Sequence, residues 1–215
     1  MNQDAVRIAA FGRSGSGKSS ILDAIAAPAR RLIVFDYLKG RGALQRQRRL
    51  KLTHVDTLTQ LRGIVAKGYR TGFRIWYQPP VDALPAALHE LAIFLWRVQQ
   101  LGGALPVTLY VDELSDSFPV TALPANQRGF YRLCKAGRHM GVNLLCASQA
   151  PAQVNTEFRR NLNACYLFSL NIEADQQAIK ALAGRQVAEF CRTVGPYRYM
   201  RLGEGGDISE GQTRR

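Results

Sequence analysis

The residues best suited to chemistry lie near the start of the chain, where Gly12 and Gly17 frame four residues and precede Lys18 and Ser19. This spacing, G-x-x-x-x-G-K-S, lets a glycine-rich backbone curl so that its N–H groups point inward at phosphate oxygens. The lysine can reach the outer phosphates, and the serine hydroxyl can bind Mg²⁺. The residues expected to bind the phosphates of a nucleotide are Gly12, Arg13, Ser14, Gly15, Ser16, Gly17, Lys18, Ser19 and Ser20.

A pair of acids follows an apolar run in "TLYVDEL". Asp112 is predicted to hold Mg²⁺ together with Ser19, and Glu113 to polarise an attacking water as a general base. Taken alone, such a pair could simply cap a helix. Beside the glycine loop, the pair indicates that water is the phosphoryl acceptor, which predicts ATP hydrolysis.

Three further side chains are candidates for completing this site. Gln149 ends the apolar run "LLCASQ", and the carboxyl ends of parallel strands crowd around the ligand, so its amide can sense the γ-phosphate or orient water. Arg138 precedes the same apolar run, and Arg159 or Arg160 precedes the next one. An arginine at a nucleotide's edge can stabilise the charge of the transferred phosphoryl group. A solvated surface position is the alternative for each of the three.

Apolar runs and helical segments alternate along the chain, which predicts an α/β domain with helices around a mostly parallel sheet. Strands are expected at 6–12, 30–37, 72–79, 106–114, 141–149, 164–170 and 196–202, and helices at 18–27, 57–67, 84–101, 126–139 and 175–183. The basic, glycine-led segment 39–52 is expected to be a loop with room for a short helix. We expect one ATPase domain over residues 1–203 and a flexible, glycine-rich tail over 204–215.

Composition restricts the partners and the environment. The net charge of +13 favours a polyanion, nucleic acid first and an anionic surface second. The four cysteines form no C-x-x-C pair, so we expect reduced, buried thiols rather than a zinc site. No run of eighteen apolar residues occurs, so no membrane span is expected.

Read together, the glycine loop, "LYVDE", "GRHMGVNLLCASQ" and "RRNLNACYLFSL" resemble the HerA/FtsK superfamily of ring-forming DNA-pumping ATPases. The "GRH" stretch is most similar to the genome-packaging ATPases of tailless icosahedral viruses with internal membranes. This resemblance implies a RecA-like (ASCE) P-loop NTPase core and a homo-oligomeric ring, expected to be a hexamer. It also implies ATP-driven, Mg²⁺-dependent translocation of double-stranded DNA.

The same resemblance implies roles for individual residues. Lys18 and Ser19 contact phosphate and Mg²⁺, Asp112 is a metal ligand, Glu113 is the catalytic base and Gln149 is the sensor. An arginine that acts on the neighbouring subunit maps to Arg138 or to Arg160. The location implied is the host cytoplasm or the packaging vertex of the virion, with capsid-vertex or membrane proteins of the virion as docking partners.

A DNA motor must bind the phosphate backbone without specificity for the base sequence. The segment "RGALQRQRRLK" is the first candidate for that contact, through Arg41, Arg46, Arg48, Arg49 and Lys51. A solvated basic helix face is the alternative. Other functions stay open: a related DNA-pumping or phage-extrusion ATPase, a small-molecule or nucleotide kinase that uses 39–51 as a lid, or a nucleotide-gated assembly protein.

Overall fold

The computed structural model describes residues 5–38, 40–103, 105–121, 123–124 and 127–213. Its strands are β1 Arg7–Phe11, β2 Arg31–Phe35, β3 Thr53–Val55, β4 Phe73–Tyr77, β5 Val107–Val111, β6 Val142–Ser148, β7 Ala164–Leu167, β8 Arg198–Leu202 and β9 Ile208–Gln212. They form one sheet in the order β3-β4-β2-β5-β6-β1-β7-β8-β9. Neighbours from β3 to β7 are parallel, whereas β8 and β9 continue the sheet in antiparallel fashion.

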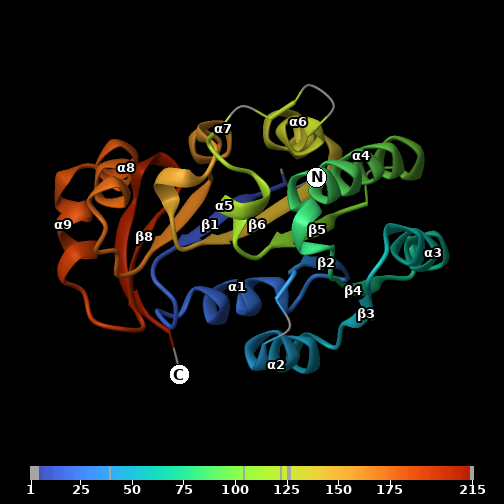
Figure 1. The fold of residues 1–215 in the computed structure, drawn as a ribbon, viewed down its shortest axis with the longest axis horizontal. Coiled ribbons are helices and arrows are strands. Elements are labelled where there is room, and N and C mark those ends of the chain that lie inside the picture. Colours follow the sequence, from blue (N-terminus) through green and yellow to red (C-terminus); the bar gives the residue numbers. More distant parts are fainter. Residues whose placement is uncertain (1–4, 39, 104, 122, 125–126, 214–215) are drawn as a thin grey trace.

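Helices cover both faces of this sheet (Figure 1). They are α1 Lys18–Ala26, α2 Arg41–Leu50, α3 Leu58–Gly68, α4 Leu84–Gly102, α5 Leu114–Ser117, α6 Gly129–Ala136, α7 Thr156–Arg160, α8 Glu173–Ala183 and α9 Arg185–Thr193. Helices α1 and α2 pack on one face, where Leu22 and Leu50 join a buried cluster with Val34 and Tyr110. Helices α3, α4, α6, α8 and α9 contribute to the larger cluster on the other face.

Local sequence explains why these elements begin and end where they do. Successive strand residues point to opposite faces, so the central strands, apolar at almost every position, fill both clusters. The hydroxyl of Thr57 caps α3 by accepting from the N–H of Gln60, whose side chain bonds back in a capping box. Helix α4 ends at Gly103, whose φ of 78° lies in the left-handed region that favours glycine.

The predicted α/β sheet is confirmed, and each expected strand and helix has an observed counterpart with shifted ends. Two segments are more regular than expected. Segment 39–52 is dominated by a ten-residue helix, α2, because apolar Ala43 and Leu50 and one buried arginine share its inner face. In the expected tail 204–215, residues 208–212 form β9 by pairing with β8; residues 214–215 lie outside the described ones. The helix expected from 126 begins at Gly129, with residue 126 also outside the described part.

All four cysteines, Cys134, Cys146, Cys165 and Cys191, are buried and free. Burial raises the pKa of the Cys146 and Cys165 thiols, which keeps them protonated. In the described part of the chain, no helix has the length and apolar character needed to cross a bilayer.

Candidate functional site

The glycine loop joins β1 to α1 and closes tightly on itself. At Gly17 the φ angle is 111°, and a Cβ there would lie 2.5 Å from Oγ1 of Thr213. At Gly12 a Cβ would lie 2.6 Å from Cβ of Phe168. The Nζ of Lys18 donates to the carbonyl oxygens of Gly12 at 2.6 Å and Arg13 at 3.0 Å, so the ammonium group lies inside the curl. The loop is therefore shaped to surround a small anionic group with N–H donors and one cation.

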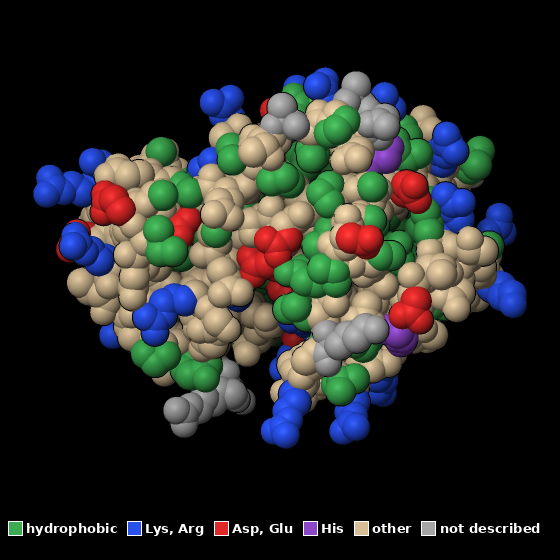
Figure 2. Space-filling view, viewed as in Figure 1, with side chains coloured by type: hydrophobic (Ala, Val, Ile, Leu, Met, Phe, Trp, Pro, Cys, Tyr) green, Lys and Arg blue, Asp and Glu red, His purple; other side chains and the backbone are tan. Residues whose placement is uncertain are grey.

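A cleft of about 250 Å³ opens beside this loop, at the carboxyl ends of the parallel strands. The cleft is lined by Ser14, Gly15, Lys18, Ser19, Asp36, Leu38, Gly40, Gly42, Ala43, Arg46, Asp112, Glu113 and Gln149. Figure 2 shows a cluster of acidic side chains in a hollow near the centre of one face, with basic side chains around the periphery. The structure thus brings Lys18, Ser19, Asp112, Glu113 and Gln149 together from separate parts of the chain. Ser20 follows in the first turn of α1.

Glu113 and Gln149 form a direct pair across adjacent strands β5 and β6. The Nε2 of Gln149 donates to Oε2 of Glu113 at 3.0 Å, and the Gln149 backbone N–H donates to Oε1 at 2.8 Å. The hydroxyls of Ser115 and Ser148 also donate to Oε1, each at 3.0 Å. Glu113 has a φ of 52°, an unfavourable value for a residue with a side chain, and these bonds fix its carboxylate despite that cost.

Arg46 occupies the floor of the cleft and not the surface. Its Nε lies 3.1 Å from Oδ1 of Asp23, its Nη1 2.5 Å from Oδ2 of Asp36 and its Nη2 2.6 Å from Oδ2 of Asp112. Its guanidinium carbon also lies 5.0 Å from the ring centre of Tyr110. The side chain is only 5% exposed, because buried carboxylates need a compensating cation. Arg46, one of the residues expected to contact DNA, is therefore buried among carboxylates and does not lie on the basic surface.

Burial and neighbouring charges shift the pKa values of several ionisable groups in the cleft. Burial and the negative charge of Asp112 raise the pKa of Asp36 to about 6, although Arg46 opposes the shift. Burial lowers the pKa of Lys18, and the carboxylates of Glu113 and Asp112 oppose that effect. Arg46 stays charged, since its aromatic and acidic neighbours more than offset the lowering of its pKa by burial.

The donor set in this cleft fits Mg²⁺. Mg²⁺ prefers hard oxygen ligands and binds through one or two protein groups together with substrate phosphates and water. The Ser19 hydroxyl and the Asp112 carboxylate line the same cleft as Lys18, which meets that requirement. Among the described residues, no group of three or more His, Cys, Asp or Glu side chains forms a metal site by itself.

Arg138 and Arg160 lie away from the cleft. Arg138 is in a short 3₁₀ helix, Gly137–Met140, just before β6, and Arg160 ends α7, just before β7. Both positions belong to the amino ends of strands: the carboxyl end of β6 reaches the cleft at Gln149, and that of β7 reaches the glycine loop, where Phe168 packs against Gly12. Strand β6 alone spans about 20 Å at roughly 3.3 Å per residue. The two arginines therefore lie near the amino ends of the parallel strands, at the opposite end of these strands from the cleft of their own chain.

The other basic candidates remain on the surface of α2 or at its end. Arg41, Arg48, Arg49 and Lys51 are exposed. Arg49 also forms an ion pair with Asp23, the same carboxylate that Arg46 contacts.

Sequence reasoning missed a second cavity, of about 210 Å³, on the other side of the glycine loop. Residues of the loop line it together with Ser169, Asn171, Arg192, Val194 and Pro196. The segment after α9 supports the loop here, since the N–H of Tyr197 donates to the carbonyl of Ser16 at 3.0 Å. Thr213 is buried and donates its own N–H to the Tyr197 carbonyl at 2.8 Å. No short motif marks these residues, which come from separate loops and strands.

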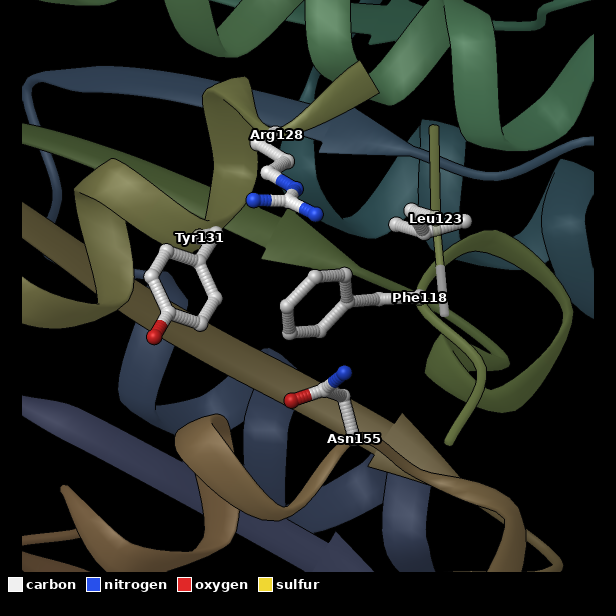
Figure 3. Close-up of a pocket in the computed structure, with 5 residues that line it drawn as sticks. All are labelled: Phe118, Leu123, Arg128, Tyr131 and Asn155. Carbon is white, nitrogen blue, oxygen red and sulfur yellow. The ribbon is translucent and has the colours of Figure 1, made fainter. Parts of the chain in front are cut away.

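A third cavity, of about 280 Å³, lies among α6 and the segments after α5 and before α7 (Figure 3). Phe118, Leu123, Arg128, Tyr131 and Asn155 line it, with the Phe118 ring between the side chains of Tyr131 and Leu123. The N–H of Asn155 donates to the carbonyl of Phe118 at 3.1 Å. The segments that follow Glu113 and Gln149 in the sequence therefore meet at this cavity.

Comparison with solved structures finds the same fold over the whole chain. The DNA-packaging ATPase B204 of Sulfolobus turreted icosahedral virus superposes with a TM-score of 0.74 and 15% identity, covering 100% of both chains. The genome packaging NTPase B204 of Sulfolobus turreted icosahedral virus 2, in complex with ATP-gammaS, gives 0.72 and 15%, covering 98% of both. VirB4 of Thermoanaerobacter pseudethanolicus gives 0.69 and 11%, covering 97% of this chain and 89% of VirB4.

No family profile and no curated protein sequence matches the chain. At these identities, the similarity to solved structures establishes the fold alone. The resemblance that the motifs indicate is confirmed at that level: the chain has the fold of the RecA-like P-loop ATPases.

Proposed function

We propose that this chain is an ATP-hydrolysing motor that translocates double-stranded DNA and packages a viral genome into a preformed capsid. The observation that carries the proposal is the meeting of the glycine loop, Asp112 and the Glu113–Gln149 pair in one cleft. Support comes from the shared fold, since two of the similar proteins are described as packaging enzymes and one holds ATP-gammaS.

In the proposed reaction, the loop holds the phosphates and Lys18 turns from its carbonyl partners toward the outer ones. Ser19 and Asp112 would hold Mg²⁺, which neutralises phosphate charge when it is bound. Glu113 accepts a proton from the attacking water. The cavity lined by Arg192 and Pro196 is suited to the nucleoside half of ATP, because it lies across the same loop.

Gln149 is proposed to switch between two partners. As observed, its amide occupies Oε2 of Glu113, so that oxygen is unavailable as a base. When a γ-phosphate enters, the amide turns toward it and frees the carboxylate. This gives the predicted sensor role a specific geometry.

The proposed motor is a homo-oligomeric ring, a hexamer by resemblance. Because Arg138 and Arg160 lie at the opposite end of the parallel strands from their own cleft, either one acts on ATP only if a neighbouring copy presents it. Exposed Arg41, Arg48, Arg49 and Lys51 are proposed to contact DNA phosphates. The proposed setting is the host cytoplasm or the packaging vertex, with capsid-vertex or membrane proteins as docking partners.

The decisive experiment measures phosphate release from ATP with and without double-stranded DNA. Stimulation by DNA, and its loss in Lys18→Ala, supports the motor. Turnover that needs a small phosphoryl acceptor would indicate a kinase, and ATP binding without turnover would indicate an assembly protein. Mixing Arg138→Ala with Lys18→Ala subunits then tests action between subunits, because only a trans-acting arginine allows partial rescue; Arg160→Ala serves as the parallel case.

A further inference from the structure

Helix α2 has two faces that serve different parts of the molecule. Its inner face carries Ala43, Arg46 and Leu50, which are buried. Its outer face carries exposed Arg48 and Arg49. Arg46 and Arg49 are three residues apart, so they lie beside each other on the helix surface, one buried and one exposed. The helix therefore places an exposed arginine next to the buried arginine of the cleft.

Arg46 contacts the very carboxylate that is suited to the metal. Its Nη2 lies 2.6 Å from Oδ2 of Asp112, and the same guanidinium is bonded to Asp23 and Asp36. A guanidinium at this distance competes with a divalent cation for Asp112, both by occupying the oxygen and by charge repulsion. In this conformation Asp112 is held by arginine and is not free for a metal.

Asp23 connects the two faces. Its Oδ1 accepts from Arg46 and its Oδ2 from Arg49, so one buried carboxylate holds both an inner and an outer arginine. A phosphate anion that binds Arg49 competes with Asp23 for that arginine. Once Arg49 has left, Arg46 is the remaining arginine bound to Asp23. The stronger attraction between Asp23 and Arg46 then favours breaking the contact between Arg46 and Asp112.

We propose that α2 is a metal-site latch: Arg46 withholds Asp112 from Mg²⁺, and a polyanion bound to Arg48 and Arg49 releases it. Arg46 is thus a positioning residue that couples occupancy of the basic surface to assembly of the Mg²⁺–nucleotide site. The identity of the polyanion as double-stranded DNA rests on the proposed function; the competition between Arg46 and Mg²⁺ does not.

The test measures binding of a fluorescent ATP analogue as Mg²⁺ is titrated, with and without a double-stranded DNA fragment. In the absence of DNA, Arg46→Gln should lower the Mg²⁺ concentration for half-maximal binding by about tenfold or more, the effect of losing one close cation. Wild type should shift in the same direction when DNA is added. Arg49→Gln should reduce the DNA-induced shift in the Mg²⁺ requirement, because the contact between residue 49 and Asp23 is already lost before DNA is added.

Two further variants and a stability measurement serve as controls. Arg132→Gln removes an exposed arginine from α6 and should leave the Mg²⁺ requirement at the wild-type value. Arg46→Gln exposes three buried acids to mutual repulsion and can fail to fold, so thermal unfolding is measured alongside it. Arg46→Lys keeps the charge but cannot span three carboxylates, so it should fold and show a smaller shift of the same sign.

The outcomes separate this proposal from the proposed function. An unchanged Mg²⁺ requirement in both folded Arg46 variants would overturn the latch. DNA that binds wild type with a salt-dependent affinity but leaves the Mg²⁺ requirement unchanged would overturn the coupling. If DNA does not bind at all, both the proposed DNA-translocating function and the release of Asp112 by DNA are refuted. The shift in Arg46→Gln still decides whether Arg46 and Mg²⁺ compete for Asp112.

Discussion

Replacing Gly17 by alanine tests how the far end of the chain supports the glycine loop. Gly17 has a φ of 111° and packs with its Cα toward Thr213 and Phe168. A methyl group there would lie 2.5 Å from Oγ1 of Thr213 and 3.1 Å from Cε1 of Phe168. The substitution therefore carries two separate costs, one in the backbone and one in packing.

Both costs can be worked out in order of magnitude. A side chain in this φ region costs about 1–3 kcal/mol. Forcing one extra carbon into a closed contact costs about 1–3 kcal/mol more. Gly17→Ala should thus lower the free energy of unfolding by about 2–6 kcal/mol, a large part of the roughly 5–15 kcal/mol of a typical domain. Gly15→Ala is the matched control: its φ is 73°, but nothing lies within 4 Å of the added carbon, so only the backbone cost applies.

Urea unfolding without nucleotide provides the assay, in a double-mutant cycle with Thr213→Ala. Removal of Oγ1 opens space for the new methyl group, so Gly17→Ala with Thr213→Ala should recover about 1–2 kcal/mol relative to additivity. Thr213→Ala should give no such recovery in the Gly15→Ala background. Strict additivity in the Gly17 cycle, within about 0.5 kcal/mol, would refute the packing of Thr213 against the loop.

Glu113, one buried aspartate and the thiols give three further expected outcomes. Glu113→Gln should still bind ATP but lower turnover by about 10²–10⁴-fold; phosphate release at the normal rate would remove Glu113 from the role of base. Burial raises the pKa of Asp175, so the wild type should lose stability as pH rises above the unfolded value of 3.8 toward the raised folded pKa. Asp175→Asn keeps an acceptor for the Ala152 N–H and should lack that loss; parallel urea curves at pH 4 to 7 would argue against the shift. The four buried cysteines should react with a thiol reagent only after unfolding, and fast native labelling would contradict their burial.

The central strands and the glycine loop could be predicted because their signals are local. Apolar runs such as 107–111 are buried at every position, and the loop spacing specifies its own geometry. Asp112, Glu113 and Gln149 could be brought together in advance, since the carboxyl ends of parallel strands share one edge of the sheet.

Arg46 could not be placed from the sequence. A run of arginines with few apolar neighbours is usually a solvated helix face, and the acids that bury this one lie at positions 23, 36 and 112. Strand β9 was missed for a related reason: its residues are mostly exposed, and pairing with β8 alone defines it. Local patterns carry no information about partners so distant in the chain.

The support of the glycine loop by Tyr197 and Thr213 also bears on the order of synthesis. The loop sequence emerges from the ribosome well before Thr213, which packs against the loop, has been made. A growing chain therefore contains every residue of the phosphate motif long before the loop is supported on both sides. We expect tight nucleotide binding only after the segment that includes Thr213 has folded against the loop. A chain ending at residue 203 that binds ATP as tightly as the full chain would contradict this.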